Sequence, residues 1–232
     1  MRAVEEKFET EFAKHVPVTF DSEINYFLGV KFYNKRKPNG DVEIKLSQAA
    51  YIDKLCKLTN LHGGRINTPT SPYQSGLPVD SIPDIQYDDI AQKRLTLQMQ
   101  TIVGLLNWLS VSTCPDIATI TSMLAKYCRN PSQAHINAAL QVVKYLKGSK
   151  HMKLKFSTTF DQSLQSLVQF PLPTHQLSGL CDANWGPQDQ SRPKENEKLP
   201  ELELFKTQSM SGFITWMNGP LMWISKRQTF TA

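Results

Sequence analysis

The spacing of apolar residues changes twice along this 232-residue chain. Between residues 24 and 46 apolar and polar side chains alternate, which is the period of a half-buried β-strand. Between residues 90 and 147 apolar side chains recur every three or four positions, which is the period of an amphipathic helix, and from residue 176 the period of two returns. Strands, helices and again strands predict an α+β fold.

A β-hairpin is predicted in the first part of the chain. Alternation through residues 26–33 and 42–46 predicts two strands, and Pro38-Asn39-Gly40-Asp41 between them is typical of a turn. Helices are predicted on either side of this hairpin, at residues 4–15 and 48–58. We expect Ser47 to cap the second of these helices and Gly63-Gly64 to mark its end.

Three further helices are predicted, at residues 90–112, from residue 113 onward, and at residues 132–147. Gly148 is a natural residue to follow the last of them. Their inner faces are expected to carry Met99, Ile102, Val103, Leu106 and Leu109, then Ile117, Ile120, Leu124 and Tyr127, then Ile136, Leu140, Val143 and Leu146.

Three strands are predicted in the last part of the chain, at residues 176–182, 211–217 and 221–225. Asn218-Gly219 predicts a tight turn between the second and third strands. The polar insert 187–208 between the first and second strands is rich in Pro and charged residues, and we expect it to be mobile.

Positive charge is concentrated in one segment. The chain has a net charge of +5, yet residues 1–60 are almost neutral, with ten cations and nine acids. Residues 117–160 hold no acid and seven cations: Lys126, Arg129, Lys144, Lys147, Lys150, Lys153 and Lys155. Such a block favours a polyanionic partner, although a solvated helix face is the ordinary alternative.

Several classes of protein are excluded by composition. The cysteines at 56, 114, 128 and 181 form no Cys-x-x-Cys pair, so neither a disulfide framework nor a zinc knuckle is indicated. The most apolar stretch, 102–111, is too short to span a membrane, and the first residues lack the apolar core of a signal peptide. We expect a soluble protein of a reducing, intracellular compartment.

Eight short motifs occur in one order that resembles the polyprotein of copia-type LTR retrotransposons. They are Ile24-Asn-Tyr-Phe-Leu-Gly29, Leu46-Ser-Gln48 followed by Tyr51, Val103-Gly-Leu-Leu-Asn-Trp-Leu109, Pro115-Asp-Ile117, Tyr145-Leu-Lys-Gly148, Cys181-Asp-Ala-Asn-Trp-Gly186, Ser209-Met-Ser-Gly212 and Trp223-Ile-Ser-Lys-Arg-Gln228. The resemblance covers the end of the reverse transcriptase and the start of the ribonuclease H domain. It implies RNA-directed DNA synthesis and cleavage of RNA/DNA hybrids in the parent polyprotein.

The resemblance also implies domain boundaries. These are a palm-remnant β-hairpin with helices and the start of the thumb at 1–65, a Pro-rich linker at 66–89, a helical thumb and connection at 90–160, a linker at 161–175, and a truncated ribonuclease H-like three-stranded antiparallel sheet at 176–232. The polymerase carboxylates of the family would lie upstream of residue 1. Gln86-Tyr87-Asp88-Asp89 is no substitute for them, because a helix start follows it instead of an apolar strand.

Asp182 matches the first metal-binding carboxylate of the ribonuclease H family. The resemblance implies that it is a catalytic residue and a Mg²⁺ ligand, at the end of a strand. One carboxylate cannot hold the two ions that this chemistry needs, and the second acid of the family would follow Ala232. We therefore expect the chain alone to be inactive in both reactions.

The basic segment matches the thumb and connection, which grip the primer–template duplex in the family. Lys126, Arg129, Lys144, Lys147 and Lys150 are therefore candidate contacts to the phosphates of an RNA/DNA hybrid or primer–template duplex. The remainder of a polyprotein would be a second partner. A non-catalytic nucleic-acid-binding module and a decayed gene fragment remain alternatives. The family implies a cytoplasmic virus-like particle, with the nucleus as a second location.

Overall fold

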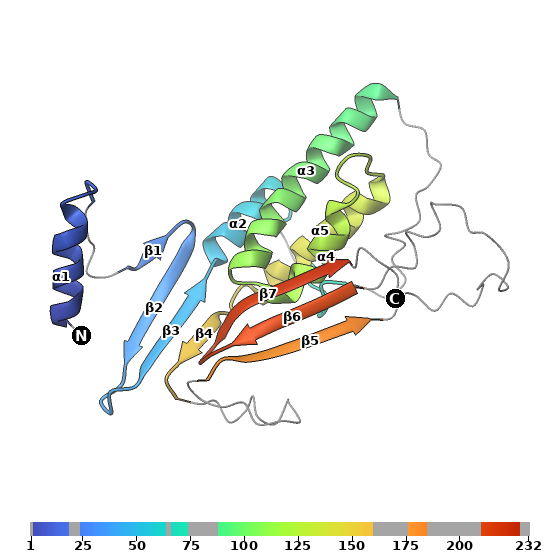
Figure 1. Cartoon of the computed structure of the whole chain (residues 1–232). Helices are drawn as coiled ribbons and strands as arrows, with labels where there is room; N and C mark the ends of the chain where they lie inside the picture. Colours follow the sequence, from blue (N-terminus) through green and yellow to red (C-terminus); the bar gives the residue numbers. More distant parts are fainter. Residues whose placement is uncertain are drawn as a thin grey trace, which may run out of the picture.

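The computed structural model describes residues 2–18, 24–63, 66–73, 88–159, 176–184 and 210–227. These residues form two antiparallel sheets and a helical body, and α4 of that body lies against β7 of the second sheet (Figure 1). The first helix, α1 (Arg2–Ala13), stacks Phe8 on Phe12 with ring centroids 5.5 Å apart, as its pattern predicts. The α+β class is confirmed.

The first sheet has the order β1-β2-β3-β4, with β1 at Tyr26–Phe27 and β2 at Val30–Arg36. Leu28 and Gly29 lie between these strands with φ angles of 49° and 86°, and Phe27 pairs with Val30. The prediction of one continuous strand at 26–33 was therefore wrong. Alternation continues through this two-residue turn, so the apolar pattern alone does not reveal the reversal of the chain.

The predicted hairpin between β2 and β3 (Val42–Ser47) is confirmed, with Gly40 at a φ of 88° in its turn. The following helix, α2 (Ala49–Leu58), begins one residue later than predicted, and its N-cap is Gln48 instead of Ser47. The helix ends before Gly63, because Asn60 already takes the left-handed conformation at a φ of 57°.

The fourth strand, β4 (Leu154–Ser157), was not predicted. It pairs with β3 through Leu46↔Leu154 and Ile44↔Phe156, so the chain returns to the first sheet after the helical body. Four residues are too few for a period of two to stand out beside a long helical pattern. The segment that was predicted to be a helical thumb and connection, residues 90–160, therefore ends in a strand of the N-terminal sheet.

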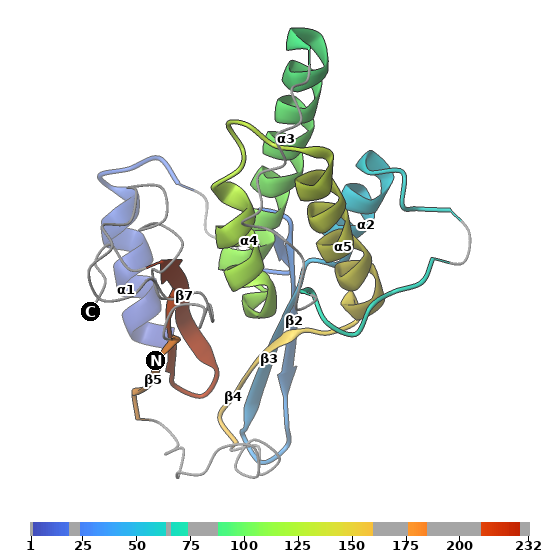
Figure 2. The same ribbon diagram turned by 90° about the vertical axis from the view of Figure 1, so that its right-hand side faces the viewer.

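The helical body consists of α2, α3 (Asp89–Ser112), a 3₁₀ turn η1 (Pro115–Ile117), α4 (Ala118–Ala125) and α5 (Gln133–Ser149). Figure 2 shows α3, α4 and α5 running side by side. Asp88 caps α3, since its carboxylate accepts a hydrogen bond from the amide of Ala91 at 2.7 Å, which agrees with the non-catalytic reading of this acidic turn.

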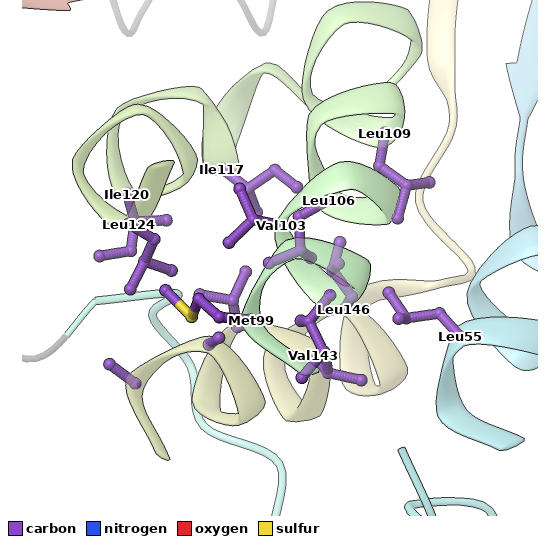
Figure 3. Close-up of a cluster of buried hydrophobic side chains, with 14 of the residues drawn as sticks. Leu55, Met99, Val103, Leu106, Leu109, Ile117, Ile120, Leu124, Val143 and Leu146 are labelled. Carbon is purple, nitrogen blue, oxygen red and sulfur yellow. The ribbon is translucent and has the colours of Figure 1, made fainter. Parts of the chain in front are cut away.

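The predicted inner faces form one core. Figure 3 shows side chains of α2, α3, η1, α4 and α5 converging on Met99, Leu106 and Leu146. Of the predicted core residues, Leu140 and Tyr127 are only partly buried. The others are buried: Met99, Ile102, Val103, Leu106, Leu109, Ile117, Ile120, Leu124, Ile136, Val143 and Leu146. Each such aliphatic side chain contributes about 1.5–3 kcal/mol of transfer free energy.

Gly148 does not follow α5 but lies inside it. A Cβ atom at this position would lie 2.8 Å from Cβ of Thr68, so the glycine lets the segment 66–73 pass close to the helix. The prediction that Gly148 follows the helix was therefore wrong, because the close contact with Thr68, and not a helix end, favours glycine here.

The second sheet has the order β5-β6-β7, formed by Ser178–Asn184, Met210–Trp216 and Pro220–Arg227. The three-stranded antiparallel prediction is confirmed, and Asn218 has a φ of 59° in the predicted turn. The predicted insert 187–208 and most of the two linkers, at 74–87 and 160–175, lie outside the described residues.

The second sheet is docked on the rest of the molecule at two points. The amide of Ser157 in β4 donates to the carbonyl of Asn218 at 2.8 Å, and a Cβ atom at Gly219 would lie 2.5 Å from the Phe156 ring. Trp223 of β7 donates its indole N–H to the carbonyl of Ser110 in α3 at 2.5 Å. Trp216 and Trp223 of this sheet are half-buried.

Candidate nucleic-acid interface

Asp182 lies inside β5 and not at its end, because the strand continues to Asn184. Its backbone pairs with Gly212, and its side chain is exposed. Within the described part of the chain no group of three His, Cys, Asp or Glu side chains could hold a metal ion. The described donors therefore do not fit a pair of Mg²⁺ ions, since Asp182 brings one carboxylate and no partner.

Two of the predicted phosphate contacts are engaged inside the protein. The ammonium of Lys147 donates to the carbonyl of Leu61 at 3.0 Å, and that of Lys150 pairs with the Asp53 carboxylate at 2.7 Å. Both bonds join the end of α5 to α2 and to the loop after it. Both lysines are partly buried, and the Lys150–Asp53 ion pair lies near the surface, with side-chain exposures of 43% and 49%.

The other three predicted cations are spread over the helical body. Lys126 follows α4, Arg129 lies in the connection to α5, and both side chains are exposed. Lys144 lies within α5 and is half-buried. Of the five predicted cations, Lys126 and Arg129 are the ones whose side chains are exposed to an incoming nucleic acid.

The first sheet gathers further lysines on one face. The pairing of β2, β3 and β4 places three rows of side chains on that face. The rows are Lys31, Ser47 and Lys153, then Tyr33, Lys45 and Lys155, then Lys35, Glu43 and Ser157. We call these nine positions the lysine face, because five of them are lysines and one is an acid.

The opposite face of the same strands is apolar. It carries Phe32 from β2, Ile44 and Leu46 from β3, and Leu154 and Phe156 from β4, all half-buried. Asn34 and Arg36 of β2 are exposed on this otherwise apolar face, and Ser47 is buried on the lysine face. Apart from these residues, the strands direct apolar side chains to one side of the sheet and lysines to the other. Sequence reasoning missed the lysine face because the lysines of β2 and β3 lie in a segment with almost no net charge.

Glu43 is the single acid of the lysine face. Its carboxylate pairs with Lys45 at 2.8 Å and with Lys155 at 3.5 Å. The hydrogen bond from Lys45 is the strongest influence on the pKa of Glu43, and together with the charges of both lysines it outweighs partial burial and holds that pKa below its ordinary value. Glu43 therefore stays ionised and neutralises part of the charge of two lysines, while three remain.

Other reactive side chains do not form a second candidate site. Burial raises the pKa of the Cys114 thiol to about 11, so this cysteine is a protonated packing residue. The Tyr145 hydroxyl donates to Asp116 at 2.5 Å, and burial together with this bond raises the pKa of Tyr145 to about 12. Cys181 is exposed, on the side of β5 that faces solvent.

Comparison with known proteins gives matches to proteins of transposons. The chain is 25% identical over 205 residues to a transposon Ty5-1 protein of Saccharomyces cerevisiae, which covers 88% of this chain and 54% of that protein. It is 26% identical over 210 residues to the retrovirus-related Pol polyprotein from transposon RE1 of Arabidopsis thaliana, covering 89% of this chain and 11% of the polyprotein. These relatives are transposon proteins.

A third relative has a different name. The secreted RxLR effector protein 161 of Plasmopara viticola is 27% identical over 131 residues, which are 56% of this chain and 72% of the effector. The chain spans about half the length of the Ty5-1 protein and about a tenth of the RE1 polyprotein. No family model and no solved structure matches the chain. None of the described helices is long and apolar enough to cross a membrane.

Proposed function

We propose that this chain is the part of a copia-type retroelement polyprotein that holds an RNA/DNA hybrid or primer–template duplex. It would comprise the end of the reverse transcriptase and the start of a ribonuclease H-like domain. The similarity to two transposon proteins over 88% and 89% of the chain supports this origin. The match to the effector protein covers 56% of the chain and does not bear on this origin.

The observation that carries the binding function is the acid-free basic segment. Residues 117–160 hold seven cations and no acid, and all seven lie among the described residues. Phosphate-rich partners are the ligands that such a surface selects, because each neutralised phosphate releases a condensed counterion. Contacts of this kind bind a duplex without reading its sequence.

The proposal assigns binding to this chain and no catalysis. Asp182 would contribute to a Mg²⁺ site only together with carboxylates that the described residues do not supply. In the parent polyprotein the other acids would come from the rest of the chain, which is the second proposed partner. The proposed location is the cytoplasm, in a virus-like particle, and the nucleus is the alternative.

Binding can be tested with a fluorescein-labelled 20-base-pair RNA/DNA hybrid. We expect the anisotropy-derived affinity to fall as salt rises from 50 to 200 mM, with a log–log slope of about −3 or steeper if at least three or four cations contact phosphate. An affinity that does not change with salt would contradict the proposal and would favour a decayed fragment without a nucleic-acid partner.

Catalysis needs its own test. The purified chain with Mg²⁺ is expected to leave the hybrid intact over hours. Cleavage that disappears in Asp182→Asn would show that the chain completes a metal site. The proposal that this chain binds the hybrid without cleaving it would then be wrong.

A further inference from the structure

The lysine face of the first sheet brings lysines of β2, β3 and β4 together on one side of the sheet. Lys31, Lys35 and Lys153 are exposed, and none of them pairs with an acid within the described residues. By contrast, Lys150 of the helical body forms an ion pair with Asp53 of α2, and Lys147 donates a hydrogen bond to the Leu61 carbonyl in the loop after α2. Three ammonium groups without an acidic partner in the described residues therefore lie on one face of β2 and the start of β4.

Tyr33 holds two of these lysines in place. The ammonium of Lys153 lies 4.5 Å from the centre of the Tyr33 ring, and that of Lys31 lies 5.1 Å from it. An aromatic ring attracts a cation without neutralising it. The two ammonium groups, which come from opposite edges of the three strands, are thus positioned together while both keep their charge for an external anion.

The dimensions of the lysine face suit a chain of phosphates. Lys31 and Lys35 are four residues apart on one strand, which corresponds to about 14 Å. The step from β2 to β4 spans two strand spacings, about 9.5 Å. Since a nucleic-acid strand carries one charge for about every 3.4 Å of rise, several phosphates fit across this surface. Lysine ammonium groups bind phosphates as point charges and read no base, so the contact proposed for this face is with the backbone.

From this geometry we infer that the lysine face is a binding surface for the phosphate backbone of a nucleic acid, with Lys31, Lys35 and Lys153 as its principal contacts. The inference rests on the proposed function, because it takes nucleic acid as the partner. It assigns the contact to a different surface from the helical cations. Charge complementarity decides the occupant, because five lysines and one glutamate attract a polyanion and repel a basic partner.

The test compares three variants that each lose three positive charges. The sheet variant is Lys31→Gln, Lys35→Gln and Lys153→Gln. The helix variant is Lys126→Gln, Arg129→Gln and Lys144→Gln. The matched control is Lys54→Gln, Lys57→Gln and Lys93→Gln, three exposed lysines of α2 and α3 that make no ion pair in the described residues. Affinity for the labelled hybrid and for its single RNA strand is measured between 50 and 200 mM salt, and folding is checked by thermal melting.

We expect the sheet variant to lose affinity by about tenfold or more at 100 mM salt and its salt slope to become shallower by about 2 to 3, because three phosphate contacts are gone. The control should change the slope by less than about 1. A variant with arginine at positions 31, 35 and 153 should bind like the wild type. A larger loss for the hybrid than for the single strand would identify the duplex as the preferred source of the phosphates, and the reverse would identify the single strand.

The outcomes separate the two proposals. If the wild type binds with the expected salt dependence but the sheet variant matches the control, the lysine face is not the contact, and the proposed function survives. If the wild type does not bind, the proposed function fails first. Should the triple variant melt early, Lys35→Gln alone decides the question, because the Lys35 side chain contacts no ring or acid in the described residues; its slope should be shallower by about 1.

Discussion

The two sheets turn outer faces of opposite chemistry to the solvent. The first sheet presents lysines, with Glu43 as the single acid. The second presents apolar side chains on the corresponding side: Phe213, Met222 and Ile224 are exposed by 36%, 52% and 46%, and Cys181 lies in the same row as Phe213 and Ile224. On the inner face of the second sheet Leu180, Ile214 and Trp223 are half-buried, and Asp182 lies on the same side of β5 with its side chain exposed.

This difference shows which of the two outer faces is well hydrated without a covering partner. Lysine ammonium groups are well hydrated, so the outer face of the first sheet needs no cover and gains only when an anion replaces its counterions. Exposed Phe, Met and Ile side chains instead leave apolar area in contact with water, at roughly 25 cal/mol per Å². The first face is therefore a surface for a charged ligand, whereas the second carries no signal for one.

The largest expected effect concerns the contact that joins the two sheets. Gly219→Ala would place a Cβ atom 2.5 Å from the Phe156 ring and 2.7 Å from the Lys155 carbonyl. Because backbone lies on one side of it, we expect the free energy of unfolding in urea to fall by about 3 kcal/mol. Gly179→Ala is the matched control, since nothing lies within 4 Å of its Cβ position, and it should be neutral or slightly stabilising. Equal effects of the two substitutions would show that the sheets do not dock here.

A second prediction compares the two sides of β7. Trp223 faces inward and donates to the Ser110 carbonyl, whereas its neighbour Ile224 faces outward. Trp223→Phe should lower the free energy of unfolding by about 1–2 kcal/mol, because the carbonyl loses its donor. Ile224→Thr should change it by less than about 1 kcal/mol, since an exposed side chain is replaced by another good strand former. A costlier Ile224→Thr in urea titrations would mean that the outer face is covered.

A third prediction uses Glu43 to sharpen the contrast between the two outer faces. Glu43→Gln removes the single acid of the lysine face and frees Lys45 and Lys155. Affinity for the RNA/DNA hybrid should therefore rise several-fold, which corresponds to about 1 kcal/mol, with a steeper salt dependence. Unchanged anisotropy titrations would indicate that the nucleic acid does not approach this face.

The same substitution has a pH dependence. The pKa of Glu43 is lower in the folded chain than its ordinary value of 4.5, so the stabilisation is fully present above that value and is lost as pH falls through the lowered pKa. Wild type should exceed Glu43→Gln in stability by about 0.5 kcal/mol at pH 7, and the two should converge in acid. Melting curves between pH 7 and pH 3 measure the difference; a gap that widens in acid would contradict this assignment.

The smallest effect is expected at Lys150, which pairs with Asp53 at the surface between α5 and α2. Lys150→Gln should lower the free energy of unfolding by about 0.5 kcal/mol and leave hybrid affinity within about twofold of the wild type. Lys153→Gln is the matched variant three residues further along, for which the order of the two effects should be reversed. Loss of binding at Lys150 with no loss of stability would return the duplex contact to the helical body.

The elements were largely predictable, because their patterns are local. Long stripes such as Met99–Leu109 and turn dipeptides such as Asn218-Gly219 determine structure within a few residues. The errors in predicting the elements occur where a contact with a residue distant in sequence determines the local structure. Glycine at position 148 leaves room for Thr68 beside the helix. The strand β4 forms by pairing with the edge of β3, which lies far away in the sequence.

The candidate interface was less predictable than the fold. Counting charge along the sequence found the basic segment but treated Lys31 and Lys35 as part of a neutral one, because acids lie near them in sequence. In the fold, Lys31, Tyr33 and Lys35 share one side of their strand. The alternation of side chains along a strand could have shown this from the sequence. Lys147 and Lys150 bond to the loop after α2 and to α2 itself. These contacts depend on how α5 packs against α2, which the local sequence does not indicate.

The pairing of Leu46 with Leu154 has a topological consequence. The chain leaves the first sheet at the end of β3 and re-enters it on the neighbouring strand, about 4.8 Å away. The whole helical body is thus an insertion between two adjacent strands. Its length can change, for example in the segment between α2 and α3, without shifting the register of a single lysine on the sheet, so the helices and the charged surface can evolve independently of each other.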